Sequence, residues 1–317
     1  MNHAVINGTG CYLPERQLTN YELENTLDTS HEWIYSRTGI MSRRVASEQE
    51  TTSYMAGCAA KKALEASSVS ADDIDLIIVA TCTPDYFFPS VACHVQKHLK
   101  ITRAIPAFDL GAACSGFMYA LDVARQYITA AGAKHVLVVG SESMSRAVDW
   151  DDRATCVLFG DGAGALVLSR SDTPGILGSV MHSSYDEEKL LALAVKNGSG
   201  DKPFVQMSGS EVFKIAVTMM GDIVDEVLVA SHLEKSDITW LVPHQANIRI
   251  IGAIAKKLSL PMSQVIVTIE HQGNTSAASI PIALDVSIRE QRIQRGDKLL
   301  LESFGGGMTW GAMVIQY

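Results

Sequence analysis

A short sequence pattern that occurs twice constrains the fold of this chain more than any other feature. Residues 120–123 read Ala-Leu-Asp-Val, and residues 283–286 repeat those four letters 163 positions later. The pair Asp73-Ile74 recurs as Asp237-Ile238, at an offset of 164. Two matches in nearly the same register predict that the chain contains two copies of one structural unit.

A third pair of similar segments supports the duplication and locates an insertion. Phe159-Gly160-Asp161-Gly162 resembles Phe304-Gly305-Gly306-Gly307, but the offset is only 145. The shorter offset predicts about 18 additional residues in the first copy, between about residues 140 and 157. The best boundary between the copies is the turn-rich stretch 171–178.

Strand-like and helical patterns alternate along the chain. Apolar runs at 76–81 and 135–140 predict strands, and the apolar spacing over 211–232 predicts an amphipathic helix. This alternation is typical of an α/β fold. No Pro- or Ser-rich linker separates the halves, so we expect residues 1–170 and 171–317 to pack as one body.

The composition excludes several classes of protein. With 47% hydrophobic and 19% charged residues over 317 positions, the chain is too apolar for intrinsic disorder. A net charge of −9 disfavours nucleic acid and anionic membranes as partners. No signal-peptide pattern or long apolar run is present, and six cysteines without a CxxC pair predict reduced thiols, no metal site and a cytoplasmic location.

Two glycine-rich segments raise the question of nucleotide binding. Gly8-Thr9-Gly10 follows a strand-like run, but Leu13 stands where the dinucleotide fingerprint needs its third glycine, and Pro14 interrupts the expected helix. We therefore expect a tight turn at residues 8–10 and not a dehydrogenase. Residues 160–164 read Gly-Asp-Gly-Ala-Gly before a strand-like run, which predicts close backbone packing.

Three polar residues stand where a strand or a Gly turn meets a helix. Cys114 lies at a predicted helix N-terminus, where free N–H groups favour the thiolate. His244 ends a strand-like run, and Asn274 follows a Gly turn. Each alone has an ordinary interpretation as a core residue, a structural histidine or a helix cap. Because they occupy equivalent junctions of repeated units, we expect them at one edge of the sheets.

These segments resemble the β-ketoacyl-acyl-carrier-protein synthase III family of thiolase-like condensing enzymes. The resemblance runs nearly end to end and is strongest at Asp28 to Ile40, around Cys114, and at 159–165, 242–247, 273–279 and 304–307. It implies a thiolase-like, duplicated, five-layered αβαβα fold and a homodimer.

The resemblance also implies the chemistry. Cys114 would accept an acyl group from acetyl-CoA or another short acyl-CoA. His244 and Asn274 would then promote decarboxylation of malonyl-acyl carrier protein. The N–H of Gly306 would complete an oxyanion hole, and Phe304 would favour neutral carbon dioxide over carboxylate. No cofactor is implied, because acyl-CoA is a substrate.

Further roles follow from the same resemblance. CoA would be held by five residues: Trp33, Arg37, Arg153, Gly209 and Asn247. Phe88 would project across the dimer and limit primer length, which favours a short primer such as acetyl. Ser115 and Met308 depart from the residues common in the family, and we expect them to reshape the acyl pocket.

The charge of −9 is unevenly distributed. Residues 238–269 contain no acid but carry Arg249, Lys256 and Lys257, and residues 33–47 contain no acid but three arginines, Arg37, Arg43 and Arg44. Such stretches are ordinarily solvated surface. The resemblance places Arg249, Lys256, Lys257 and Lys214 in a docking patch for the acidic carrier protein, giving the acidic body a cationic mouth.

Two alternatives remain open from the sequence. The chain could condense a different primer in secondary metabolism, or it could be a non-catalytic carrier-binding partner of another synthase. The Cys-His-Asn set argues against the second alternative, and it also differs from the second Cys of thiolases and the second His of elongating synthases.

Overall fold

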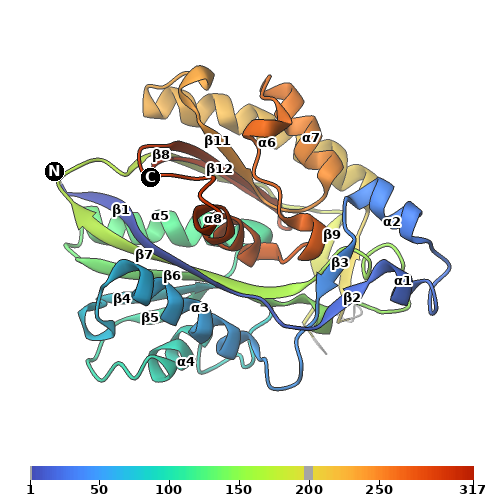
Figure 1. Cartoon of the computed structure of the whole chain (residues 1–317), viewed down its shortest axis with the longest axis horizontal. Coiled ribbons are helices and arrows are strands. Elements are labelled where there is room, and N and C mark those ends of the chain that lie inside the picture. The colour runs from blue at the N-terminus through green and yellow to red at the C-terminus, as the bar shows by residue number, and fades with distance from the viewer. Residues whose placement is uncertain (1, 196–202) are drawn as a thin grey trace.

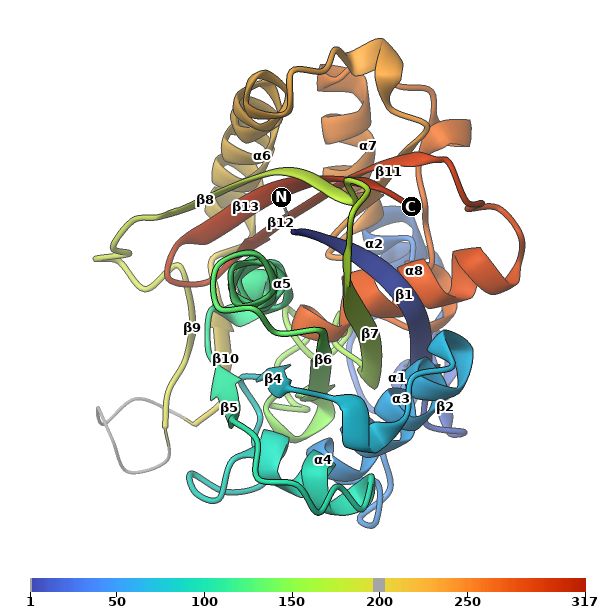
Figure 2. The same cartoon turned by 90° about the vertical axis from the view of Figure 1, so that its left-hand side faces the viewer.

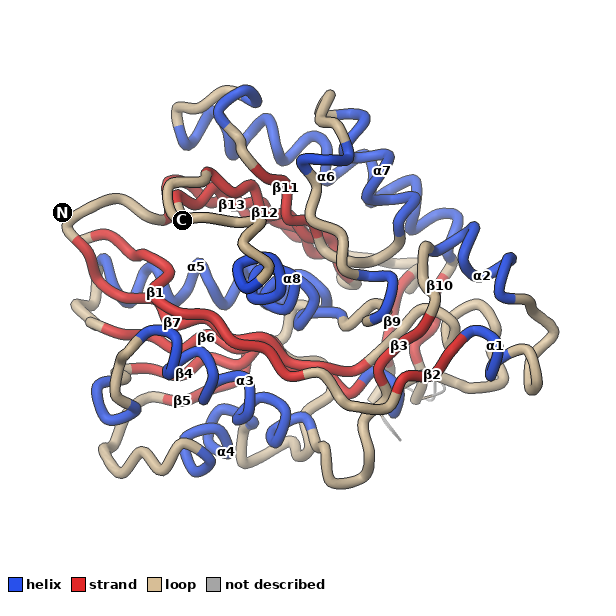
Figure 3. The backbone as a smooth tube through the Cα atoms, in the orientation of Figure 1, coloured by secondary structure: helices blue, strands red, loops and turns tan. Residues whose placement is uncertain are grey.

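The computed structural model describes residues 2–195 and 203–317, which form two large β-sheets, two small two-stranded sheets and three layers of helices. The layers alternate, with a helical layer on each outer face and a third between the sheets (Figures 1 and 2). Figure 3 shows the strands of each sheet enclosed by helices on both sides. No helix within the described residues is long and apolar enough to cross a lipid bilayer.

The first sheet has the strand order β1-β7-β6-β4-β5. Strand β4 runs parallel to both β5 and β6, whereas β7 is antiparallel to β6 and β1. Its strands are β1 (His3–Tyr12), β4 (Leu76–Ala80), β5 (Ala107–Leu110), β6 (His135–Ser143) and β7 (Asp161–Ser171).

The second sheet repeats this arrangement with β11-β12-β13-β8. Strand β11 is parallel to β12, and β13 is antiparallel to β12 and β8. Beside β11, Val265 forms an isolated parallel bridge with Leu241, in the position that β5 occupies beside β4. The strands are β8 (Ile176–Ser183), β11 (Trp240–Pro243), β12 (Lys298–Gly305) and β13 (Thr309–Gln316). The shared order and directions confirm the predicted duplication.

The extra residues of the first copy lie between two antiparallel strands. Residues 144–160 connect β6 to β7, whereas residues 306–308 alone connect the equivalent β12 and β13. The longer connection therefore lies close to the interval that the sequence offsets indicate.

The helices occupy three layers. Helices α5 and α8 fill the space between the sheets. Helices α3 and α4 cover the outer face of the first sheet, and α6 and α7 cover that of the second (Figure 2). They are α3 (Thr52–Ser67), α4 (Val91–His98), α5 (Gly116–Thr129), α6 (Gly209–Ser231), α7 (Ile248–Lys257) and α8 (Ser279–Arg289). Helix α6 confirms the amphipathic helix predicted over 211–232.

The central helices are apolar on more than one side because each contacts both sheets. In α5, Phe117, Leu121, Ala124 and Ile128 are fully buried and form one core cluster with residues of both sheets. An ordinary surface helix would expose the opposite face. The central layer therefore couples the two halves through apolar packing.

A group of short elements lies together at one end of the molecule (Figure 1). These are β2 (Gln17–Thr19), α1 (Asn20–Leu23), α2 (His31–Thr38), β3 (Ser42–Arg44), β9 (Leu191–Leu193) and β10 (Val205–Met207). Helix α2 begins where the Ser30 hydroxyl accepts the Trp33 N–H, which satisfies a donor of the first turn. In the described parts of the chain, 3₁₀-helices connect the larger elements at Ala71–Asp73, Ala113–Ser115, Met144–Arg146, Lys235–Asp237, Met262–Gln264, Ile269–His271 and Ser276–Ala278.

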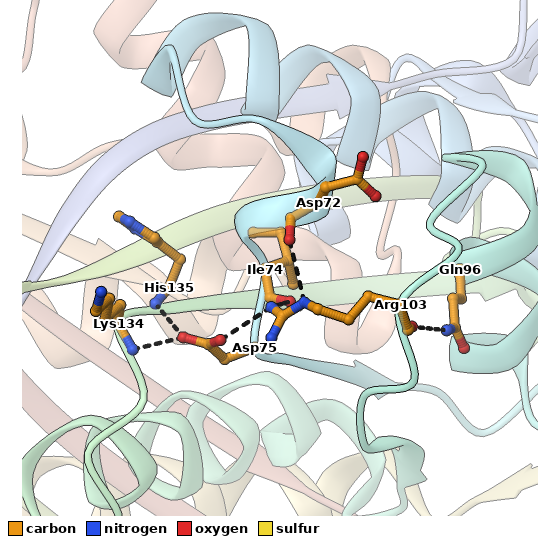
Figure 4. Close-up of polar contacts among 7 residues, drawn as sticks. All are labelled: Asp72, Ile74, Asp75, Gln96, Arg103, Lys134 and His135. Carbon is orange, nitrogen blue, oxygen red and sulfur yellow. Dashed lines mark hydrogen bonds and ion pairs between the residues drawn. The ribbon is translucent and has the colours of Figure 1, made fainter.

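A polar network fixes the starts of the parallel strands in the first sheet (Figure 4). The Asp75 carboxylate, just before β4, accepts the main-chain N–H groups of Lys134 and His135 at the start of β6. It also pairs with Arg103 at 2.9 Å, and Arg103 lies in the segment that leads into β5. The strand starts are thereby held together, while their carboxyl ends are left to form a site.

The prediction of a turn at residues 8–10 is wrong. Gly8 and Gly10 lie inside β1, where a Cβ at either position would meet a carbonyl oxygen of α3 at 2.4 Å. The glycines therefore allow α3 to lie directly on the strand. The close packing predicted for the second glycine segment is confirmed, since a Cβ at Gly164 would be 2.6 Å from the Ile282 nitrogen.

The contact at Gly10 makes a testable prediction about stability. A Gly10→Ala variant should lose about 2 kcal/mol of unfolding free energy, because its Cβ would meet the Ala59 carbonyl oxygen at 2.4 Å. Urea unfolding followed by circular dichroism measures the change. The control is Gly252→Ala in α7, where nothing lies within 4 Å of the added Cβ; there we expect a gain of up to about 1 kcal/mol. Equal stability of the Gly10→Ala and native chains would contradict the packing described.

Candidate active site

A cavity of about 580 Å³ brings residues of both halves of the chain together. Cys114, His244 and Asn274 all line it, so the structure assembles the three reactive groups that the sequence singled out. Trp33 of α2 also lines the cavity, together with residues of α6, β9 and β10. The walls are largely apolar, as expected for a site that admits a small organic ligand.

Cys114 lies in the 3₁₀-helix Ala113–Ser115, between the end of β5 and the start of α5. Ala113 has a φ of +47°, an uncommon conformation for a residue with a side chain. Two hydrogen bonds from the second half of the chain hold this turn. The Ser303 hydroxyl donates to the Cys114 carbonyl, and the Thr309 hydroxyl donates to the Ala112 carbonyl, both at 2.9 Å. The nucleophile is therefore fixed by contacts across the repeat.

Opposing influences act on the Cys114 thiol. Burial raises its pKa to about 11, and a hydrogen bond from the Ser276 hydroxyl to Sγ, at 3.4 Å, acts in the opposite direction. The prediction that the start of a helix favours the Cys114 thiolate is wrong in its net effect, because burial outweighs it. Burial is the largest influence on the pKa, so the resting group is a thiol that loses its proton as it attacks.

His244 follows β11 and is almost completely buried. Its main-chain N–H donates to the Glu302 carbonyl at 2.8 Å, which extends the pairing of β11 with β12. The imidazole Nδ1 lies 2.6 Å from the Ser279 hydroxyl. Burial lowers the pKa of His244 to about 4, so the ring is uncharged near neutral pH.

Asn274 is held by its main chain between two residues of the other half. Its N–H donates to the Leu158 carbonyl at 2.8 Å, and its carbonyl accepts the Gly160 N–H at 3.0 Å. The side-chain Oδ1 accepts the Ser276 N–H at 2.8 Å, so Nδ2 is the group that the amide offers to a ligand. Asn274 and His244 thus provide uncharged polar groups in one cavity.

The glycine-rich turn after β12 lies against the nucleophile. Gly306 lines the cavity, and so does Phe304, which is 5% exposed. A Cβ at Gly305 would lie 2.7 Å from the Cys114 nitrogen, so only glycine permits this approach. The predicted residues Gly306 and Phe304 therefore line the same cavity as Cys114.

The residues predicted to bind CoA lie mostly at the α2 side of the cavity. The Arg37 and Arg153 guanidiniums lie 5.0 and 4.9 Å from the centre of the Trp33 ring. Such an arrangement of planar groups can accept a further flat ring. Gly209 and Asn247 line the same cavity, and Asn247 also caps α7 by accepting the Arg249 N–H at 2.8 Å.

Phe88 lies outside the cavity lining of its own chain. Its side chain is 86% exposed, and those of Tyr86 and Phe87 are also exposed. Ser115 and Met308, which the sequence suggests as residues that reshape the acyl pocket, do not line the cavity within the described residues. The Ser115 hydroxyl instead donates to the Thr309 carbonyl at 2.9 Å, and Met308 packs in the core beneath α6 and α7.

The predicted cationic mouth is smaller than the sequence windows indicate. Lys214 and Arg249 line the cavity, and Arg249 lies over the Phe213 ring. Lys257 instead pairs with Asp222 of α6 at 2.6 Å, which joins the two helices.

Arg43, the central arginine of the other cationic window, is completely buried. It donates to the Asn20 side chain and to the Leu18 and Val157 carbonyls, so it adds no charge to the mouth. The sequence could not distinguish this buried arginine from an exposed one, because the two cationic stretches were identified only by their lack of acidic residues.

Three residues beside the reactive groups received no role from the sequence. Cys82 lines the cavity near Cys114, and its thiol also contacts the Ser276 hydroxyl. Ser276 and Ser279 contact Cys114 and His244 respectively. Both serines belong to the segment 273–279 that carries the family resemblance, but serine is too common at helix starts for its presence there to indicate more than a cap.

Comparisons with known proteins agree with this site. Residues 108–184 match the family described as 3-oxoacyl-[acyl-carrier-protein] synthase III, and residues 228–317 match its C-terminal part. The chain is 55% identical to the β-ketoacyl-[acyl-carrier-protein] synthase III of Alkalilimnicola ehrlichii, over the full length of both proteins.

Two solved structures are similar to the whole fold. The 3-oxoacyl-[acyl-carrier-protein] synthase III of Aquifex aeolicus VF5 superposes with a TM-score of 0.95 at 49% identity, covering 99% of this chain and 100% of that one. The priming β-ketosynthase of the R1128 polyketide pathway gives a TM-score of 0.92 at 36% identity, covering 99% and 96%. The full-length identity and the two matched regions together place this chain in the 3-oxoacyl-[acyl-carrier-protein] synthase III family.

Proposed function

We propose that this chain catalyses the initiating condensation of type II fatty-acid synthesis. In that reaction, acetyl-CoA and malonyl-acyl carrier protein give acetoacetyl-acyl carrier protein, CoA and carbon dioxide. The observation that carries the proposal is the meeting of Cys114 with uncharged His244 and Asn274 in one cavity. The full-length similarity to proteins named for this activity supports it.

The first half-reaction transfers the acyl group to Cys114. The sulfur attacks the thioester carbonyl of acetyl-CoA, the bond to the CoA sulfur breaks, and the departing thiolate receives the proton that the Cys114 thiol gives up. The carbonyl oxygen becomes negatively charged between these steps. The N–H groups of Cys114 and Gly306 would stabilise it, and the approach of Gly305 to the Cys114 nitrogen supports that geometry.

The second half-reaction forms the new carbon–carbon bond. The malonyl group loses carbon dioxide, and the electrons of the broken bond form an enolate on the thioester. His244 and Asn274 would donate hydrogen bonds to the enolate oxygen, and Phe304 would disfavour the charged carboxylate. The enolate carbon attacks the acetyl-Cys114 carbonyl, the Cys114 sulfur leaves, and it regains a proton from solvent.

The proposal also covers how CoA binds, which cofactors are needed and where the protein works. The CoA adenine would lie against Trp33 and Arg153, and Arg37 would lie near the CoA phosphates. The nucleophile and the two donor groups suffice for both half-reactions, so we propose no resident cofactor or metal. A protein of this function would work in the cytoplasm, where its reduced thiols and its CoA and carrier substrates are found.

A homodimer is part of the same proposal. Tyr86, Phe87 and Phe88 expose apolar rings next to one another, which a lone chain would leave in water. In the dimer, Phe88 would enter the partner's acyl pocket and limit the primer to a short chain.

A second candidate is the priming condensation of a polyketide pathway with a different acyl primer. The similarity to the R1128 priming β-ketosynthase favours it. The two candidates share the reaction and differ in the acyl-CoA that they accept.

The acyl-enzyme can be tested directly. After incubation with acetyl-CoA carrying a labelled acetyl group, peptide mapping by mass spectrometry should find about one label per chain on Cys114, because its sulfur is the proposed nucleophile. Cys114→Ser is the control and should carry no label at that residue. An unlabelled native chain, or a label that persists in the Cys114→Ser variant, would refute the acyl-Cys114 intermediate.

The role of Phe88 in primer selection can be tested by substitution. A Phe88→Ala variant should accept hexanoyl-CoA at least about tenfold better relative to acetyl-CoA, since a large ring is removed from the proposed pocket. Phe87→Ala is a matched control, because its side chain is 82% exposed and is given no place in the pocket. Competition assays with mixed acyl-CoA primers measure the ratio, and an unchanged ratio in Phe88→Ala would remove this residue from primer selection.

The carrier-docking surface makes a charge-dependent prediction. An Arg249→Glu variant should raise KM for malonyl-acyl carrier protein about tenfold, far more than KM for acetyl-CoA, and the difference should shrink at high salt. Lys61→Glu, a similar charge reversal at an exposed site of α3, should leave both KM values unchanged. Equal effects of Arg249→Glu on both substrates would contradict docking at this surface.

A further inference from the structure

The segment 274–279 carries two buried serines whose hydroxyl groups face different reactive groups. It runs from Asn274 through the 3₁₀-helix Ser276–Ala278 to the first residue of α8. Ser276 and Ser279 are each 2% exposed, so their hydroxyl groups need partners within the protein. The Ser276 hydroxyl contacts the Cys114 sulfur and the Cys82 thiol, and the Ser279 hydroxyl contacts His244.

The direction of the hydrogen bond between Ser279 and His244 decides which nitrogen of the imidazole carries the proton. The Ser279 oxygen accepts the Gln245 N–H at 3.3 Å, and its own buried proton needs an acceptor. Within residues 2–195 and 203–317, the acceptor in range is Nδ1 of His244, at 2.6 Å. A neutral imidazole has one N–H. If Nδ1 accepts, that N–H is on Nε2.

This tautomer suits the second half-reaction. With Nδ1 occupied by Ser279, Nε2 presents a donor, and Asn274 presents a second one at Nδ2 because its Oδ1 is occupied by the Ser276 N–H. Two uncharged donors match a developing enolate oxygen. In the other tautomer, Nε2 would present a lone pair and repel that oxygen.

The Ser276 hydroxyl acts on the other reactive group. It donates to the Cys114 sulfur at 3.4 Å, and it is held there by a backbone with a φ of +48°. A serine in this conformation is strained, and such strain is concentrated at functional sites. Its counterpart in the first repeat, 163 residues earlier, is Ala113, which has a φ of +47°. A hydrogen bond to sulfur stabilises the charge that develops as the thiol loses its proton.

We infer that Ser276 and Ser279 are positioning residues that serve separate half-reactions: Ser276 orients and activates the Cys114 sulfur for acyl transfer, and Ser279 holds His244 in the Nε2–H tautomer for decarboxylation. The inference rests on the proposed function for its assignment of steps. The hydrogen bonds themselves can be tested without turnover.

The two alanine variants should separate the steps. Ser279→Ala should form acetyl-Cys114 from acetyl-CoA within about twofold of the native rate, but its acetylated form should react with malonyl-acyl carrier protein at least about tenfold more slowly. Ser276→Ala should show the reverse order, with acyl transfer slowed more than the reaction of the acetylated form. Rapid-quench measurements of each step give the two rates. Equal slowing of both steps in either variant would overturn the assignment.

Ser115→Ala is a matched control for the loss of a buried hydroxyl. Ser115 adjoins Cys114 and is completely buried, but its hydroxyl bonds the Thr309 carbonyl and neither reactive group. It should leave the ratio of the two rates unchanged. A ratio that shifts as much as in the other two variants would mean that local packing, and not the hydrogen bonds, accounts for their effects.

Two measurements do not depend on catalysis. ¹⁵N NMR of the native chain should find the His244 proton on Nε2 and a mixture of tautomers in Ser279→Ala. The pH profile of Cys114 alkylation by iodoacetamide should move to higher pH in Ser276→Ala and stay unchanged in Ser279→Ala. A proton on Nδ1 in the native chain, or an unmoved alkylation profile, would overturn the inference. Failure of the proposed function would instead leave both results intact and abolish acyl transfer in the native chain.

Discussion

The site depends on a main-chain bridge between the two halves of the chain. Asn274 accepts from Gly160 and donates to Leu158, so one residue of the second half is paired like a strand residue with the loop before β7. Gly160 is required there, because a Cβ would lie 2.3 Å from the Gln272 carbonyl oxygen. Once the bridge fixes the backbone at Asn274, it also fixes the direction of its amide and the start of the turn that carries Ser276 and Ser279. The proposed chemistry follows from the orientation of this segment towards Cys114 and His244.

The reactive groups Cys114, His244 and Asn274 are uncharged in the resting chain, and this suits a reaction that creates charge only transiently. Burial keeps His244 neutral and keeps the Cys114 thiol protonated in the resting chain. Burial also raises the pKa of Glu302 to about 8, and neither of its carboxyl oxygens has a hydrogen-bond partner within the described residues. This acid is therefore mostly protonated at neutral pH. In such surroundings a hydrogen bond to an enolate or an oxyanion is stronger than it would be in water.

The sequence predicts the duplication and the three reactive groups because both are local signals. Repeated letters report the repeated unit, and Cys114, His244 and Asn274 each adjoin a glycine turn or a strand end that can be recognised from a few residues. Features that depend on distant contacts were predicted wrongly or not at all. Gly8 and Gly10 face α3 instead of forming a turn, and Arg43 is buried against another element instead of facing a ligand. Ser276 and Ser279 resemble ordinary helix caps until the fold brings Cys114 and His244 to their hydroxyl groups.

The central claim is that groups from both halves of the chain act in one cavity to join two acyl units with loss of carbon dioxide. Mass spectrometry of the carrier protein after incubation with acetyl-CoA, malonyl-acyl carrier protein and the native chain tests it most directly. The account predicts that the carrier gains an acetoacetyl group, with one carbon dioxide released per product. A carrier that retains its malonyl group, or that is converted only to the acetyl form, would contradict the account.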